Sequence, residues 1–108
     1  MLAAHFSLAN LTLIIDNNKM QSDGEKSKVL DPNSFVDKFL AFGFDVSEVN
    51  GHEVSELAQA ITKKSDKPHA VVANTVKGKG ISFMEAQPSW HYGVLRESDY
   101  LLAIDELS

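Results

Sequence analysis

Apolar positions along the chain change their spacing from one segment to the next, and these changes predict alternating strands and helices. Residues 11–16 form an almost uninterrupted apolar run, which is typical of a strand covered on both faces in a parallel sheet. Residues 44–49 alternate apolar and polar side chains, which predicts a strand with one partly exposed face near a sheet edge. Residues 70–76 are again largely apolar and predict a third strand.

The segment between the first two strands has apolar residues at helical spacing. We expect a helix that begins at Asp31-Pro32, is capped by Asp31 or Asn33, and ends at Gly43. Its apolar stripe, which we expect to be core, consists of Phe35, Phe39 and Phe42.

The same spacing predicts two further helices after the second and third strands. The first should end at Lys63-Lys64, where positive charge suits the negative end of the helix dipole, and the second should run over about residues 98–107. Residues 81–96 show no clear periodicity. The side chains expected to face inward are Val54, Leu57, Ala58 and Ile61 in the first helix and Leu101, Ile104 and Leu107 in the second.

The order strand, helix, strand, helix, strand predicts a three-layer α/β/α arrangement around a parallel sheet with right-handed crossovers. The loops after the first and third strands, residues 17–24 and 77–80, must then lie at the same carboxyl edge. Proteins of this class place ligand sites at such an edge. Taken alone, Asn17-Asn18 equally suits a simple turn, because asparagine tolerates left-handed backbone angles.

Composition narrows the classes of function. The chain has 108 residues, 44% of them hydrophobic and 23% charged, as in a globular protein with one core. The net charge of -5 argues against nucleic-acid or membrane partners, and no apolar run approaches the length of a membrane span. The absence of cysteine excludes disulfides and thiolate metal sites. Since the first residues lack the basic start of a secretion signal, we expect a cytoplasmic protein.

The first eight residues carry apolar side chains at helical spacing, but no capping residue precedes them. They look like the last turns of a helix that begins upstream, although a short natural N-terminal helix is the alternative. We therefore expect residues 1–108 to be a single partial domain, truncated at its N-terminus.

Several separated motifs follow one another along the chain. They are Asn10-Leu11, Asp16-Asn17-Asn18-Lys19-Met20, Asp23-Gly24, Gly43, Val49-Asn50-Gly51-His52, Thr75-Val76-Lys77-Gly78-Lys79-Gly80 and Trp90-His91. In this order they resemble the transketolases, and in particular the stand-alone N-terminal subunits of split transketolases. The first three match the second half of that family's thiamine diphosphate motif. The resemblance covers nearly the whole chain and implies the C-terminal half of a thiamine diphosphate-binding (transketolase PP-type) domain.

The resemblance implies two cofactors, thiamine diphosphate and Mg²⁺. Asn18 would supply its side-chain oxygen and Met20 its backbone carbonyl to the magnesium ion, which takes oxygen ligands in octahedral geometry. The family's third protein ligand, the aspartate of a Gly-Asp-Gly motif, has no counterpart, because Ser22-Asp23-Gly24 matches the end of the motif and not its beginning. The implied cofactor-binding residues are Asn18, Met20, Gly24, Lys77, Gly78, Lys79, Gly80 and His91.

The lysine–glycine segment and the histidine each have a second interpretation. Residues 77–80 alone would be a flexible turn with two solvated lysines, whereas the resemblance favours glycines that approach the cofactor and lysines that attract phosphate. A lone histidine such as His91 is more often structural, whereas the resemblance implies a catalytic role beside the diphosphate. The run His91-Tyr92-Gly93 departs from the family pattern Trp-His-Gly by an extra tyrosine. His52 follows a turn and is expected at the surface or at a cap.

The chemistry implied by the resemblance is transfer of a two-carbon ketol unit between sugar phosphates, carried by the cofactor. It requires a pyrimidine-binding domain or C-terminal transketolase subunit, and the active site forms between chains, which implies an oligomer. We therefore expect this chain alone to be inactive. The alternatives are another thiamine diphosphate enzyme, of the deoxyxylulose-phosphate synthase or dihydroxyacetone synthase type, and a non-catalytic remnant or interaction module.

Overall fold

The computed structural model of the protein describes residues 1–21, 24–25 and 32–108. The chain divides into two compact units. The sheet unit comprises Met1–Asn17 and Pro32–Thr75, and the loop unit comprises Asn18–Asp31 and Val76–Ser108. The Ser22-Asp23 pair and the helix start expected at Asp31 lie outside the described residues.

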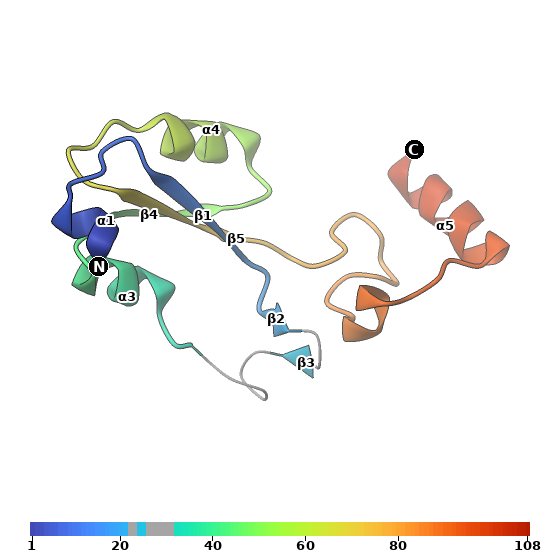
Figure 1. Ribbon diagram of the computed structural model, residues 1–108. Coiled ribbons are helices and arrows are strands. Elements are labelled where there is room, and N and C mark those ends of the chain that lie inside the picture. Colours follow the sequence, from blue (N-terminus) through green and yellow to red (C-terminus); the bar gives the residue numbers. More distant parts are fainter. Residues whose placement is uncertain (22–23, 26–31) are drawn as a thin grey trace. The chain divides into compact units, whose positions relative to one another are not determined.

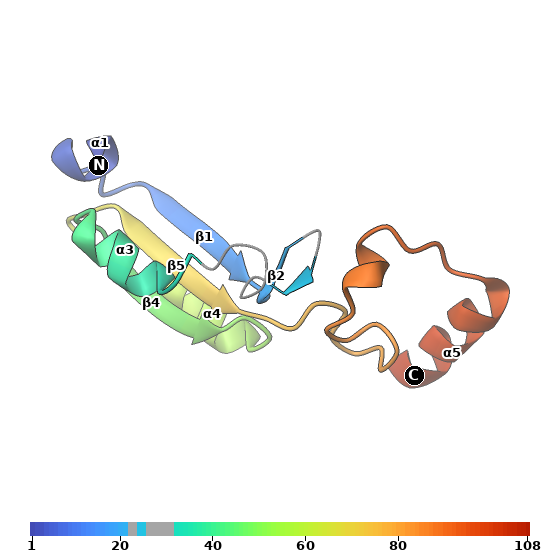
Figure 2. The same ribbon diagram turned by 90° about the horizontal axis from the view of Figure 1, so that it is seen from below.

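The sheet unit has the predicted α/β architecture. Its strands β1 (Thr12–Asn17), β4 (Asp45–Asn50) and β5 (His69–Asn74) are parallel and lie in the order β1-β5-β4. Helix α4 (Val54–Thr62) covers one face, and α3 (Phe35–Ala41) covers the other, which gives three layers (Figures 1 and 2). A short helix, α1 (Leu2–His5), precedes β1, as expected from the first residues.

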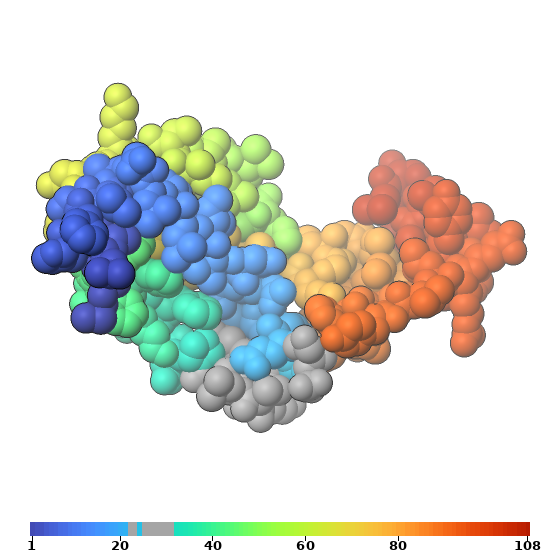
Figure 3. Space-filling view, in the orientation of Figure 1, coloured from blue at the N-terminus to red at the C-terminus, as the bar shows by residue number. Residues whose placement is uncertain are grey.

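The buried core of this sheet lies on β5, the central strand. Residues 70–73 of β5 are at most 5% exposed. The expectation that the apolar run of β1 is covered on both faces is wrong, because Leu13 and Ile14 are 39% and 52% exposed. β1 lies at the edge of the sheet, and its segment, in lighter blue, is on the surface in the space-filling view (Figure 3). β4 occupies the other edge, as its alternating pattern predicted.

Helix α3 ends as predicted at Gly43, whose φ of 84° suits a glycine. The Gly43 N–H donates to the Leu40 carbonyl and the Phe44 N–H to the Phe39 carbonyl, and the Phe39 and Phe44 rings pack edge to face at 5.3 Å. These are the two hydrogen bonds and the apolar contact of a Schellman motif.

The start and the buried face of α3 differ from the expectation. Its N-cap is Ser34, whose hydroxyl accepts from the Asp37 N–H at 3.0 Å, and Asn33 is not the cap. The expected phenylalanine core is only partly formed, because no residue of α3 is fully buried and Phe42 is 48% exposed. Helical periodicity therefore predicted the position of the helix but not how deeply its apolar side chains are buried.

Small residues, rather than the expected large ones, are buried on the other two helices. In α4 the buried residue is Ala60, while Val54 and Ile61 are exposed. In α5 (Glu97–Leu107) it is Ala103, while the expected inward residues Leu101, Ile104 and Leu107 are exposed. A small side chain such as alanine allows the backbone of a helix to approach its neighbour closely.

Among its described residues, the loop unit contains little regular structure besides α5. Met20–Gln21 (β2) and Gly24–Glu25 (β3) form a two-stranded antiparallel pair, and Pro88–His91 forms a 3-10 helix, η1. The remainder of residues 81–96 is irregular, in keeping with its lack of periodicity. Within the described ranges, every helix is too short or too polar to cross a membrane.

Candidate cofactor site

The carboxyl ends of β1 and β5 lie side by side, as the predicted topology requires. Asn17 and Asn74 are partners in the parallel register and end the two strands. The Asn17 amide Nδ2 donates to Asn74 Oδ1 at 2.8 Å, and Asn17 is only 6% exposed. Both candidate loops, one beginning at Asn18 and one containing Lys77, therefore leave from one edge of the sheet.

The first loop begins with a turn that fixes the Asn18 side chain. Asn18 Oδ1 accepts a hydrogen bond from the Met20 N–H at 2.9 Å, which is the arrangement of an Asx turn. Lys19, between them, has a φ of 63°. An amide oxygen has two lone pairs, so this bond orients Oδ1 and leaves it able to accept a second partner, including a cation.

The second loop is closed by a backbone hydrogen bond and by close packing at a glycine. The Lys77 carbonyl accepts from the Ala86 N–H at 2.9 Å. Gly78 has a φ of 73°, and a Cβ there would lie 2.5 Å from the Met84 carbonyl oxygen. Only glycine therefore fits at this position, because the backbone of Met84 packs closely against it.

Glu85 organises the remainder of this loop, although no motif or periodicity in the sequence singles it out. Its Oε1 accepts from the Gly80 N–H at 3.0 Å and lies 3.5 Å from the Lys79 ammonium nitrogen. Lys79 therefore has a carboxylate partner inside the loop. The two lysines that the pattern Lys-Gly-Lys-Gly presents as equivalent have different surroundings.

A cavity of about 210 Å³ in the loop unit collects residues from three separate motifs. It is lined by Asn18, Met20, Gln21, Lys77 and His91. Four of these were predicted from sequence as cofactor-binding residues, and Gln21 was not. The other predicted residues, Gly24, Gly78, Lys79 and Gly80, do not line it. Gly24 has a φ of 140°, and no atom of the described residues lies within 4 Å of the position of a Cβ.

Aromatic contacts surround His91 at the end of η1. The extra tyrosine of this sequence, Tyr92, packs its ring edge to face against His91 at 4.5 Å. The neighbouring Trp90 donates its indole N–H to the Phe83 carbonyl at 3.0 Å. Gly93 lies against the Trp90 ring so closely that a Cβ would be 2.4 Å from it. The segment 90–93 is thus held by its own side chains, with His91 at the cavity.

The donors around this cavity fit part of a magnesium–diphosphate group. Asn18 and Met20 offer neutral oxygens, Lys77 offers an ammonium group and His91 an imidazole, which together suit a cation already accompanied by phosphate oxygens. None of the described residues that line the cavity carries a carboxylate, and residues 1–21, 24–25 and 32–108 hold no cluster of three histidine or acidic side chains suited to a metal ion. Most of the ion's ligands would therefore come from phosphate, from water and from protein groups other than these.

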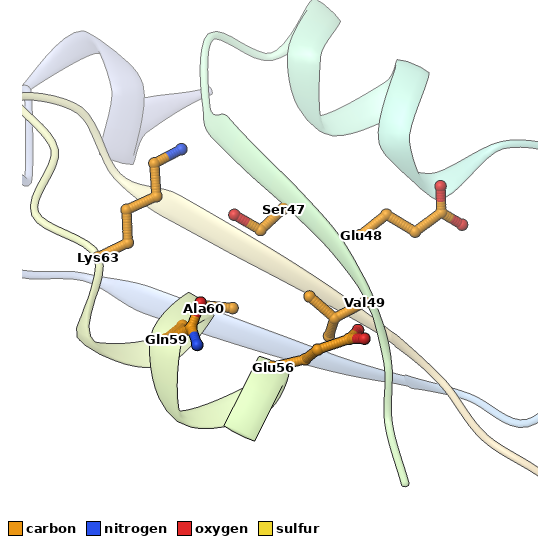
Figure 4. Close-up of a pocket in the computed structure, with 7 residues that line it drawn as sticks. All are labelled: Ser47, Glu48, Val49, Glu56, Gln59, Ala60 and Lys63. Carbon is orange, nitrogen blue, oxygen red and sulfur yellow. The ribbon is translucent and has the colours of Figure 1, made fainter. Parts of the chain in front are cut away.

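A larger hollow, of about 420 Å³, lies in the sheet unit, between β4 and α4 (Figure 4). Its charged groups already have protein partners. Lys63 pairs with Asp45 at 2.9 Å, and Glu56 accepts from the Asn50 N–H at 2.9 Å. The residues that line it, none of them in the predicted site, are Ser47, Glu48, Val49, Glu56, Gln59, Ala60 and Lys63. Size alone therefore does not mark the candidate site.

Two residues of the sheet unit, His69 and Asp45, have pKa values shifted by their surroundings. His69 is 2% exposed, its Nε2 lies 3.0 Å from Ser47 Oγ, and its Nδ1 finds no hydrogen-bond partner among the residues that the structure describes. Burial lowers the pKa of His69, against a smaller opposing effect of Asp45. The hydrogen bond from Lys63 lowers the pKa of Asp45. His69 starts β5, at the opposite end from Asn74, so these shifts belong to the core rather than to the cofactor site.

Comparison with known proteins identifies the family. Residues 1–106 match the model of the transketolase family for its thiamine diphosphate binding domain. The chain is 39% identical over 106 residues to an apulose-4-phosphate transketolase subunit of Phocaeicola vulgatus, covering 95% of this chain and 38% of that protein. It is 34% identical over 110 residues to a 6-deoxy-6-sulfo-D-fructose transketolase subunit of a Clostridium species, covering 99% of this chain and 40% of that protein.

A solved structure agrees with these sequence matches. The crystal structure of transketolase from Campylobacter jejuni superposes with a TM-score of 0.88 at 31% identity, covering 98% of this chain and 17% of that one. The chain therefore spans only a minor part of the length of the relatives that it matches. Since the family model covers nearly every residue, the chain belongs to the transketolase family, within its thiamine diphosphate-binding domain.

Proposed function

We propose that this chain binds the diphosphate end of thiamine diphosphate together with Mg²⁺, as one part of a transketolase. The observation that carries the proposal is the shared cavity. Asn18 and Met20 follow β1, Lys77 follows β5 and His91 ends η1, yet all line one cavity of about 210 Å³. These residues come from motifs that lie far apart in the sequence, and a diphosphate with its metal is the ligand that explains their combination.

Different residues would contact different parts of the ligand. Asn18, through the side-chain oxygen oriented by the Met20 N–H, and Met20, through its backbone carbonyl, would coordinate magnesium. Lys77 would neutralise diphosphate charge, and His91 would act as the catalytic residue of this chain by donating a hydrogen bond to the diphosphate or the substrate. Lys79, which Glu85 engages, would add positive potential without direct contact.

The bound cofactor would supply the chemistry of ketol transfer, while the protein holds and orients it. We further propose that the substrates are sugar phosphates or closely related sugars, and that a second chain or domain contributes the pyrimidine-binding site within an oligomer. The relatives named for apulose 4-phosphate and for 6-deoxy-6-sulfo-D-fructose support a polar, anionic sugar as the substrate class. The purified chain alone should transfer no ketol unit from a ketose phosphate, and activity without a partner would contradict this division of roles.

Calorimetric titration of the chain with thiamine diphosphate, with and without magnesium, tests the proposed site. We expect weak binding that depends on magnesium. Asn18→Ala should remove the magnesium dependence, because it deletes the oriented side-chain oxygen. His52→Ala should bind as the natural chain does, because His52 does not line the cavity. Equal heats with and without magnesium, or unchanged binding by Asn18→Ala, would show that the metal site is wrongly assigned.

A further inference from the structure

Side chains at the carboxyl end of the sheet form a continuous chain of hydrogen bonds across all three strands. Asn17 Nδ2, on β1, donates to Asn74 Oδ1 on β5 at 2.8 Å. Asn74 Nδ2 in turn donates to Glu48 Oε1 on β4 at 2.9 Å. Asn17, at one end of this chain of hydrogen bonds, is 6% exposed, whereas Glu48, at the other end, is exposed. A buried amide is thus linked through Asn74 to a carboxylate at the surface.

The charge of Glu48 sets the direction of this chain. A carboxylate only accepts hydrogen bonds, so Asn74 must turn its NH₂ group toward Glu48 and its oxygen toward Asn17. Asn17 must then donate. In Figure 4 the Glu48 side chain extends away from α4, whereas Ser47 and Val49 lie on the α4 side. One acidic side chain thus fixes the orientation of two amides.

Further bonds tie the same residues to the backbone where the strands end. The Thr75 N–H donates to the Asn17 carbonyl at 3.4 Å, and the Thr75 hydroxyl donates to Asp16 Oδ1. The Gly51 N–H donates to the Asn74 carbonyl at 2.7 Å. Because the ends of strands fray, side-chain bonds at the last register pair restrict the motion of the two chain segments that leave there.

We propose that Asn74 is a positioning residue for cofactor binding: its amide, oriented by Glu48, holds Asn17 and so fixes where the chain departs toward Asn18 and toward Lys77. Asn18 follows Asn17 directly, and Lys77 comes three residues after Asn74. Asn74 itself does not line the cavity of Asn18 and Lys77. This inference rests on the proposed cofactor site, but the hydrogen-bond chain can be tested without the cofactor.

A double-mutant cycle tests the inference. Asn74→Asp keeps the acceptor for Asn17 but sets a carboxylate against Glu48, and it should weaken magnesium-dependent thiamine diphosphate binding about tenfold. Glu48→Gln alone should change binding by less than about threefold, because the new amide can present its oxygen to Asn74. The double variant Asn74→Asp/Glu48→Gln should return to within about threefold of the natural affinity, since the new amide donates to the new carboxylate. Glu53→Gln, the same change on an exposed residue outside the chain of hydrogen bonds, is the matched control.

Amide hydrogen exchange at Thr75, whose N–H donates to Asn17, provides a readout that needs no cofactor. We expect faster exchange in Asn74→Asp and recovery in the double variant. Unchanged exchange in Asn74→Asp would show that Asn74 does not hold Asn17 in place. Altered exchange with unchanged cofactor affinity would overturn its positioning role. If the natural chain binds no cofactor, the proposed function and the positioning role both fail, and recovery of exchange across the cycle would then support only the hydrogen-bond chain.

Discussion

Strands β1 and β5 are neighbours in the same parallel ladder and look alike in sequence, but they have opposite surroundings. Ile14 of β1 and Val71 of β5 are register partners, both β-branched, yet Ile14 is 52% exposed and Val71 is fully buried. β5 lies between two strands and beneath helices on both faces, whereas β1 is at the edge. An apolar run therefore indicates that a segment is a strand, while the order of strands decides how much of it is covered.

The largest expected difference between the strands concerns charge at this register pair. Val71→Asp should unfold the protein, because a buried unpaired carboxylate costs more than about 4 kcal/mol. Ile14→Asp should cost less than about 1 kcal/mol, since water can solvate the new charge at an exposed position. Urea denaturation followed by circular dichroism measures both. Similar midpoints for the two variants would show that β1 is as well covered as β5.

The loop after β5 offers a second comparison of this kind, between two lysines that are close in sequence but have different surroundings. Lys77→Ala should weaken thiamine diphosphate binding by about tenfold or about 1.4 kcal/mol, because Lys77 lines the cavity. Lys79→Ala should weaken it less, because Glu85 engages that ammonium group. Titration calorimetry of both variants gives the ratio of the two losses in thiamine diphosphate affinity. Equal losses would mean that the loop acts through total charge and not through the position of one lysine.

The buried start of β5 should make stability depend on pH. Because burial lowers the pKa of His69 in the folded protein, the neutral ring is favoured there. The resulting stability should be fully present above the ordinary pKa of 6.5 and should decline as the pH falls from 6.5 through the lowered folded pKa. The slope is at most about 1.4 kcal/mol per pH unit for one proton.

Urea denaturation between pH 7.5 and pH 5 measures this dependence. His69→Gln should flatten the curve in that range. His52→Ala, which removes an exposed histidine, should leave the curve unchanged. A curve that stays equally steep in His69→Gln would assign the pH dependence to another group.

The smallest expected effect on stability is at the open edge of β1, where association is the clearer readout. An apolar edge strand without a charged residue among positions 11–15 can pair with other chains. We expect the natural chain to associate as its concentration rises, and Ile14→Lys to reduce this while changing stability by less than about 0.5 kcal/mol. Sedimentation velocity at several concentrations measures the association of both proteins. A natural chain that stays monomeric at every concentration would contradict the expectation.

Local patterns in the sequence were sufficient for much of the fold. The order of strands and helices, the helix end at Gly43 and the parallel sheet were predicted correctly, because each depends on spacing or backbone preference within a few residues. The cap at Ser34 was missed in favour of its neighbours, since three capping residues lie close together there. The motifs at Asn18 and Lys77 predicted two loops at one sheet edge, and both residues line one cavity.

The burial and pairing of particular side chains depend on residues distant in the sequence, and only the tertiary structure decided them. The sequence could not show that β5 rather than β1 is central, that His69 is buried beside Ser47, or that Lys79 turns to Glu85 while Lys77 reaches the cavity. Nor did any pattern indicate that Asn74 connects Asn17 to Glu48. The physical reason is that periodicity records which face of an element is apolar, whereas burial and pairing depend on neighbours brought close only by the folded chain.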